Sequence, residues 1–281
     1  MKIVIKLIQR DIINGYYQVR YKILIFCCLV ISSIISYAYN IDKGLLDGSY
    51  LEIASLGDLI QYIFLGPFDV APLGNSFFRL PVVWLGFHMM VAYLVGDYIQ
   101  DDLSGTGQLI LIYSRKRFYW WVSKFVWVLV FVTSLYLLSY VILIVASLIF
   151  NFTLSFLITP QLSFALFAKD YSLTSIYSFI LIYFILPLLT SFVVSEIQAT
   201  LTLIVKPVLA FVLVICLYVL SIYVINPFLI TNYAIPAHNS VYIDGGMDAV
   251  LGIVSLCFLL IVVFIIGSIL FKYKDFLERI E

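Results

Sequence analysis

The longest uncharged stretch of this chain constrains its fold more than any motif does. No Asp, Glu, Lys or Arg occurs between Lys124 and Lys169, and apolar runs of the same kind recur along the sequence. A helix needs about 20 apolar residues to cross the roughly 30 Å hydrocarbon core of a bilayer. Hydrophobic residues make up 64% of the 281 residues and charged residues 11%, whereas a soluble domain has about 25% charged residues. The composition therefore predicts an all-α integral membrane protein.

Six apolar runs are expected to form transmembrane helices, with residues 1–281 making a single transmembrane domain. The stretch after Lys124 is long enough for two crossings, or for one crossing followed by a re-entrant or interfacial piece. Polar residues alternate with Phe in 151–170, which favours the second arrangement because irregular backbone in hydrocarbon leaves amides unpaired. A kink is expected at Pro187. The predicted spans are residues 23–41, 81–96, 125–149, 171–195, 207–225 and 249–271.

The distribution of basic residues predicts the orientation. Residues 1–22 carry five Lys and Arg against one acid, with apolar residues on another helical face, which is typical of a helix lying in the membrane interface; a plain basic leader before the first span is the alternative. With both termini, residues 97–124 and the turn near residue 200 inside, thirteen of the 16 Lys and Arg are cytoplasmic. We therefore expect a multi-pass plasma-membrane protein with both termini in the cytoplasm. Residues 42–80, partly lying on the membrane, and 227–248 are expected outside.

Residues 97–124 are the polar segment around which the predicted topology is arranged. They contain two glycines in a turn, a basic cluster and a double tryptophan. Basic side chains are attracted to anionic head groups, and Trp rings favour the head-group level of a bilayer. Arg115, Lys116, Arg117, Trp120 and Trp121 are therefore expected to anchor a cytoplasmic docking loop at the membrane surface. The basic cluster as an orientation signal alone is the other interpretation.

Motifs for catalysis are lacking in the sequence. There is no phosphate-cradling GxxxxGK[ST] loop and no Cys/His cluster with zinc spacing, so neither an enzyme, a cofactor nor a metal is predicted. A formal net charge of zero gives no reason to expect nucleic-acid binding. His88 is a candidate for a transport pathway, or a neutral histidine hydrogen-bonded between helices. The acids Asp97, Glu196 and Asp248 are expected at the ends of spans.

The order of these segments resembles the type-2 ABC transporter permeases. The resemblance rests on DDLSGTGQLILIYSRKRFYWWVSKF at 101–125, EIQATLTLIVKP at 196–207 and FKYKDFLER at 271–279. Residues 151–170 and the long first outer loop depart from the family pattern. The resemblance implies a bacterial exporter subunit with six transmembrane helices, an N-terminal interfacial helix and a cytoplasmic coupling helix over residues 98–112. Its contacts to a separate cytoplasmic ABC ATPase subunit are expected at Asp101, Asp102, Leu103 and Gln108.

Partners and substrate follow from the same resemblance. ATP and magnesium would be bound by the ATPase subunit, and a second permease chain, identical or different, would complete the pathway in the lipid bilayer. Permeases of this composition resemble exporters of antimicrobial or signalling peptides, while lipids, polysaccharides and drugs stay open as substrates. The alternative function is a membrane accessory or immunity protein that binds a peptide or partner without transporting it.

Overall fold

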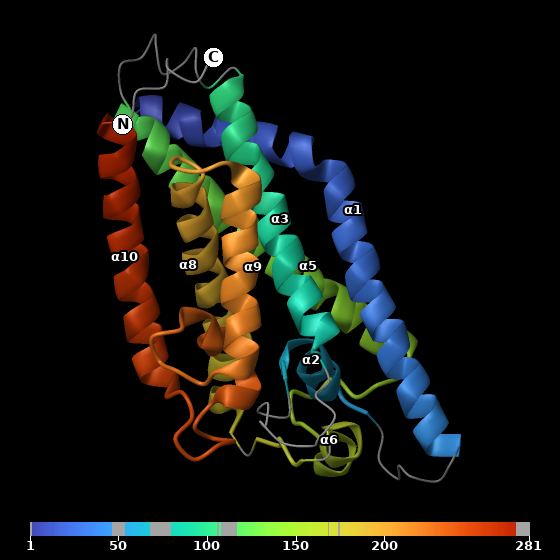
Figure 1. The fold of residues 1–281 in the computed structure, drawn as a ribbon. Coiled ribbons are helices and arrows are strands. Elements are labelled where there is room, and N and C mark those ends of the chain that lie inside the picture. Colours follow the sequence, from blue (N-terminus) through green and yellow to red (C-terminus); the bar gives the residue numbers. More distant parts are fainter. Residues whose placement is uncertain are drawn as a thin grey trace.

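The regular structure of the chain is helical (Figure 1). The computed structural model describes residues 2–46, 54–67, 80–105, 107, 117–167, 169–173 and 175–273, and within them the only strand-like features are two isolated bridges, Ser55 to Thr153 and Asn239 to Met247. The long helices are α1 (Lys2–Leu46), α3 (Val82–Ser104), α5 (Arg117–Ile149), α8 (Leu186–Leu201), α9 (Pro207–Tyr223) and α10 (Ala249–Tyr273). The short ones are α2 (Leu56–Phe64), α6 (Pro160–Phe167), α7 (Ile176–Phe179), the π-helix η1 (Ile180–Ile185) and the 3₁₀-helices η2 (Ile230–Ala234) and η3 (Pro236–His238).

Four helical stretches among the described residues are long and apolar enough to cross a membrane. They are Val4–Lys43, Arg117–Ile149, Ile176–Leu201 and Ala249–Tyr273, and Val82–Gly96 and Pro207–Tyr223 are shorter apolar helices. The exterior of α10 shows the same character, because Val254, Phe258 and Ile261 are each 60% exposed or more. An apolar surface of this extent is stable against lipid and unstable in water. These features are those of a membrane protein.

The first helix differs from its predicted division into an interfacial helix over 1–22 and a span over 23–41. It is one continuous helix, whose first part runs across the end of the bundle that carries both termini before the rest descends along its side (Figure 1). Its sequence has no proline to end it. Gly15 lies within this helix at its contact with α5. A larger residue would not fit there, because an added Cβ would lie 2.1 Å from the Trp127 Nε1 atom.

The other predicted spans match helices whose ends lie elsewhere. The helix at the second predicted span, α3, continues two turns further, to Ser104, and the helix at the third, α5, begins at Arg117 instead of residue 125. The fourth begins at Ile176 and reaches Leu201 by way of the π-helix η1, which directly precedes the helix carrying Pro187. The carbonyl that Pro187 cannot bond in an α-helix is that of Tyr183, and it accepts a 3.1 Å hydrogen bond from the Tyr140 hydroxyl. A neighbouring helix thus compensates the irregularity.

Within the described part of residues 151–170 there is no further helix long enough to cross a membrane. Residues 151–159 run with little regular structure alongside α2, where Leu56 N donates to Thr153 O at 2.9 Å and Thr153 N donates to Ala54 O at 3.0 Å, and the short helix α6 follows. The Asp58 carboxylate completes this junction by accepting hydrogen bonds from the backbone N–H and hydroxyl groups of both Ser55 and Thr159. Burial raises the pKa of Asp58, against the opposing effect of these donors. The apolar side chains of α2 that were expected on the membrane are buried inside the protein.

The segment between α9 and α10, expected as an external loop, is also packed into the protein. Residues 231–239 are all buried. The Trp84 indole donates to the Ala234 carbonyl at 2.8 Å, and Ala237 N donates to the Leu65 carbonyl at 3.1 Å. The end of the bundle opposite the termini is therefore closed by irregular chain whose polar groups bond to α2 and α3.

Candidate functional site

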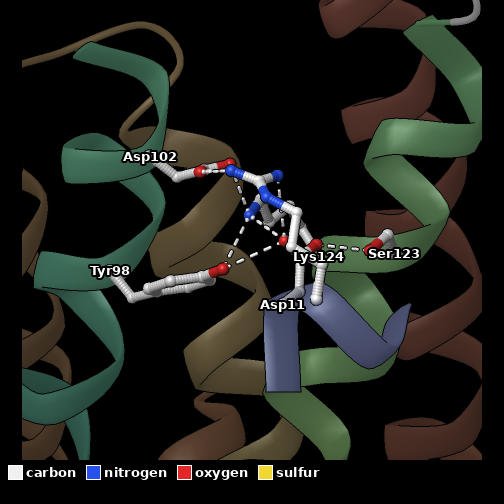
Figure 2. A network of polar contacts seen from close by, with 6 residues as sticks. Asp11, Tyr98, Asp102, Ser123 and Lys124 are labelled. Atoms are coloured by element: carbon white, nitrogen blue, oxygen red, sulfur yellow. Dashed lines mark hydrogen bonds and ion pairs between the residues drawn. The ribbon is translucent and has the colours of Figure 1, made fainter. Parts of the chain in front are cut away.

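Three helices meet at a buried ion-pair network at the end of the bundle that carries the termini (Figure 2). The Lys124 ammonium on α5 lies 2.9 Å from the Asp11 carboxylate of α1 and 2.7 Å from the Asp102 carboxylate of α3. The side chains of Lys124 and Asp11 are each 1% exposed, and that of Asp102 is 4% exposed. One cation therefore bridges two carboxylates away from water.

The remaining groups of the network complete its hydrogen bonding and its charge. Tyr98 donates to Asp11 at 3.0 Å, Ser123 donates to the other Asp11 oxygen, and Arg10 pairs with Asp102. Two carboxylates thus face two cations, so the network is neutral as a whole. We call Arg10, Asp11, Tyr98, Asp102, Ser123 and Lys124 the buried polar cluster.

Local sequence positions the cluster on each helix. Tyr98 and Asp102 are four residues apart on α3 and so share one face, while Ser123 and Lys124 are the seventh and eighth residues of α5. The Lys124 ammonium lies 4.3 Å from the centre of the Tyr98 ring and 4.8 Å from that of Trp120. Aromatic faces attract a desolvated cation. The Lys124 ammonium is therefore in contact with two aromatic rings as well as two carboxylates.

Sequence reasoning missed this cluster. In the sequence, Asp11 is the one acid of a basic segment and Lys124 is the last cation of the predicted docking loop. The partners lie 113 residues apart, and nothing in the spacing of either segment pairs them. The available signal was the position of Lys124 itself, a cation inside a run of Trp, Val and Phe where an unpaired charge is costly.

The four residues predicted to contact the ATPase subunit lie in different environments. Asp102 is buried in the cluster, where its carboxylate pairs with Lys124 and Arg10 of the same chain, and its contact with a partner stays a prediction. Asp101 is exposed and accepts a hydrogen bond from Gln18 of α1. The first residues of the predicted helix over 98–112 belong to α3, which continues from the predicted span to Ser104, while residues 106 and 108–112 lie outside the described residues. The side chain of Leu103 and the whole of Gln108 lie outside the described residues.

The predicted surface anchors also differ. Arg115 and Lys116 lie outside the described residues, and Arg117 donates to the Lys272 carbonyl at the end of α10 at 3.0 Å. Trp120 and Trp121 are 1% and 0% exposed, so they do not anchor the chain at the membrane surface. They pack α5 against α10 instead. Trp120 stacks on Phe271 with ring centres 4.5 Å apart, and the Trp121 indole donates to the Phe264 carbonyl at 3.2 Å.

His88 lies inside the bundle, 1% exposed and bordered by rings. Its Nδ1 atom is 3.2 Å from the Ser191 hydroxyl, and its ring stacks on Tyr218 with centres 4.8 Å apart. Ser191 in turn lies 2.8 Å from the Tyr136 hydroxyl, which donates to the Pro187 carbonyl. The geometry is that of a histidine hydrogen-bonded between helices.

Two acids lie deeper than the sequence suggested. Glu196, expected at the end of a span, is 0% exposed within α8, and neither of its carboxyl oxygens has a hydrogen-bond partner among the described residues. Asp11, expected in an interfacial helix, is also 0% exposed. Within the described residues no group of three or more His, Cys, Asp and Glu side chains is placed to hold a metal ion.

At the opposite end, His238 is held by an amide. Asn232 donates through its Nδ2 atom to the carbonyls of Val224 and Asn226, so its Oδ1 atom faces His238 Nδ1 at 2.8 Å and accepts from it. The proton is thereby assigned to Nδ1. The Nε2 atom is buried and has no hydrogen-bond partner in the part of the chain that is described. Burial lowers the pKa of His238 to about 4.

Comparison with protein families identifies the family of this chain. Neither the curated proteins nor the solved structures yield a match to the chain. A family model described as a protein of unknown function matches residues 68–277, which is most of the sequence and includes the α3 and α5 parts of the buried polar cluster. The chain belongs to this family, DUF2705.

Proposed function

We propose that the chain is the permease subunit of an ATP-driven exporter, whose ATP hydrolysis occurs on a separate cytoplasmic subunit. The observation that carries the proposal is that the buried polar cluster joins both ends of the 105–117 connection to α1. In an exporter of this kind, the membrane helices must respond to a subunit that docks on a loop between them. A docking loop can pass a movement of the ATPase subunit to the membrane helices only if the ends of the loop are firmly attached to those helices.

The contacts that tie them are close and desolvated. Asp102 lies two residues before the end of α3, and Lys124 lies seven residues after the start of α5. The Lys124 ammonium lies 2.7 Å from the Asp102 carboxylate, so this ion pair joins the end of α3 to the first turns of α5. The second ion pair of Lys124, with Asp11, adds α1. Removing one partner from a buried pair leaves an uncompensated charge and costs about 3–5 kcal/mol. A displacement at the loop would therefore move α1, α3 and α5 together.

The surface beside the cluster fits a docking role. Asp101 and Gly105 are exposed at the end of α3, on the end of the bundle that carries both termini. The resemblance of residues 101–125 to type-2 permeases assigns this segment to contact with the ATPase. A second permease chain would complete the pathway, and an antimicrobial or signalling peptide is the proposed cargo.

The proposal is tested by isolating the full-length protein with an affinity tag from its native membranes. We expect a cytoplasmic protein with a phosphate-binding loop to be captured, and the captured complex to hydrolyse ATP faster than the ATPase subunit alone. Capture of partners that hydrolyse no nucleotide would overturn the proposal and favour the accessory or immunity function.

A matched pair of variants tests the role of the cluster in this complex. Asp102→Asn keeps the side-chain shape but removes the charge, so we expect permease-stimulated hydrolysis to fall about tenfold or more while the subunits still co-purify. Asp248→Asn, an exposed acid at the other end of the bundle, is expected to leave hydrolysis unchanged. Equal rates in the two variants would show that the cluster does not couple the subunits.

A further inference from the structure

A small cavity lies between α3, α8 and α9, three helices that pack against one another (Figure 1). Its volume is about 150 Å³, and it is lined by Tyr93, Gly96, Gln198, Pro207, Val208 and Phe211. These residues lie near the end of α8 and the beginning of α9, so the cavity is at the end of the bundle that carries both termini.

One polar group of the lining lacks a partner. The Gln198 side chain is 1% exposed and donates through Nε2 to the Ala92 carbonyl at 3.0 Å. Since that bond fixes the amide nitrogen toward α3, the Oε1 atom is the oxygen left over, and it is buried with no hydrogen-bond partner among the described residues. An unsatisfied buried acceptor is unfavourable. A ligand that brings a hydrogen-bond donor into the cavity would satisfy it.

Positive charge lies beside the same cavity. The Lys22 ammonium is 4.8 Å from the centre of the Tyr93 ring, and Lys206 directly precedes Pro207, which begins α9. The N-terminus of a helix carries the positive end of its dipole and favours an anion. A ligand here can therefore carry an anionic group next to its donor.

The remaining lining is apolar and opens to the outside of the bundle. Val208 is 74% exposed and Tyr93 is 38% exposed, and the next residue, Leu209, is 49% exposed. This surface belongs to apolar helices of a membrane protein, so lipid is what reaches the mouth of the cavity. A single water, which needs two to four polar partners, would find few of them among these side chains.

We propose that this cavity binds the head group of an anionic glycerophospholipid that carries hydroxyl donors. A hydroxyl of the head group would donate to Gln198 Oε1, the phosphate would lie toward Lys22, Lys206 and the start of α9, and the acyl chains would follow the exposed apolar surface of α9. The site is independent of the exporter function proposed above.

Phosphatidylglycerol is the probe for the test, titrated into the full-length protein after purification in a lipid-free detergent. A ligand that binds the folded state raises the thermal midpoint, so the midpoint reports binding. We expect phosphatidylglycerol to bind at least about tenfold more tightly than phosphatidylcholine, whose head group has no donor and no net charge. Equal binding of the two lipids would overturn the proposal. Glycerol 1-phosphate, the soluble source of the same chemistry, is expected not to compete, and competition by it would assign the cavity to a free phosphate instead.

Variants locate the binding. Gln198→Leu is expected to weaken phosphatidylglycerol binding about tenfold, and Lys22→Gln is expected to reduce its preference over phosphatidylcholine. Lys272→Gln, another cation over a tyrosine ring at the same end, is the control. Because Gln198→Leu also removes the bond to α3, Val208→Trp closes the mouth from an exposed position and is expected to abolish binding, whereas Leu209→Trp is not. Unchanged binding in Val208→Trp would overturn the site.

Discussion

At the scale of single residues, Lys124 is the group on which the buried polar cluster depends. Its ammonium pairs with both Asp11 and Asp102 where three helices meet, and its side chain is 1% exposed, whereas Arg10, which also contacts both carboxylates, is 19% exposed. A complete buried ion-pair network adds little to the free energy of unfolding, because the cost of desolvation offsets much of the attraction. Removing one member is strongly destabilising, since a buried charge is then left without its partner. The role of Lys124 is therefore to fix how the three helices meet.

Replacing Lys124 with Met is expected to lower the free energy of unfolding by about 3–5 kcal/mol, since both carboxylates are left buried with less compensation. Lys43→Met, at an exposed position of α1, is the matched control and is expected to change it by less than about 0.5 kcal/mol. Chemical unfolding in detergent measures both. If Lys124→Met and Lys43→Met have the same cost, the cluster is not a buried ion-pair network.

A second residue-scale prediction concerns pH. Burial holds the pKa of His238 at about 4, below its ordinary value of 6.5. Between these values the unfolded chain binds a proton that the folded chain does not, so stability is full above about pH 6.5 and is lost as the pH falls toward 4. The shift corresponds to a loss of about 3 kcal/mol.

The measurement is the thermal midpoint between pH 7 and pH 4. His238→Gln, whose amide can still donate to Asn232, is expected to flatten the acid side of this profile. An identical slope in the variant would assign the acid sensitivity to other groups.

At the scale of elements, glycines set how closely the helices approach. Trp127 of α5 lies against Gly15 of α1, and Trp121 lies against Gly267 of α10, where an added Cβ would be 2.1 Å from the indole in each case. Trp121 and Trp127 of α5 thus each pack against a glycine of a neighbouring helix. This arrangement, together with the Tyr140 bond to the irregular backbone before Pro187, explains why long helices with little polar patterning pack in one way.

Gly15→Ala tests this packing. Alanine is the better helix former by about 1 kcal/mol, yet its Cβ would overlap the Trp127 ring. We expect a net destabilisation of about 1–3 kcal/mol, as for other overpacked cores. Gly86→Ala is the control, because the nearest atom to its Cβ is a terminal methyl of Leu29 at 3.3 Å, which can move. A stabilised Gly15→Ala protein would show that α1 and α5 do not meet at this point.

The sequence predicts a structural feature well when the residues that determine it are neighbours in the chain. Apolar runs are local, so the helices themselves were expected, although their ends were misplaced where α3 continues to Ser104 and α5 begins at Arg117. The burial of Trp120 and Trp121 was missed, because a Trp pair near basic residues suits a membrane surface and a helix interface equally well. The Asp11 to Lys124 pair was missed since it joins residues 113 positions apart. Tertiary packing decides such cases.

At the scale of the whole molecule, the two ends of the bundle differ in construction. One end carries the start of α1, the end of α3, the start of α5, the end of α10 and the buried polar cluster, and the other is closed by α2, α6 and the buried residues 231–239 (Figure 1). The first end is also the side on which the excess of Lys and Arg was expected, and basic residues favour the cytoplasmic face. The asymmetry predicts one orientation in the membrane.

This orientation is tested with single cysteines in a chain whose native cysteines, at positions 27, 28, 216 and 257, are replaced by Ser. Cysteine at Phe228, which is 92% exposed, and at the exposed Asp244 is expected to react with a membrane-impermeant maleimide in intact cells. Cysteine at the exposed Gly105 is expected to react only after the cells are opened. Because the two ends lie on opposite sides of an apolar bundle, a reversed pattern would invert the topology and remove the docking surface from the cytoplasm. Labelling of both ends from outside would instead show that the helices do not cross the membrane as proposed.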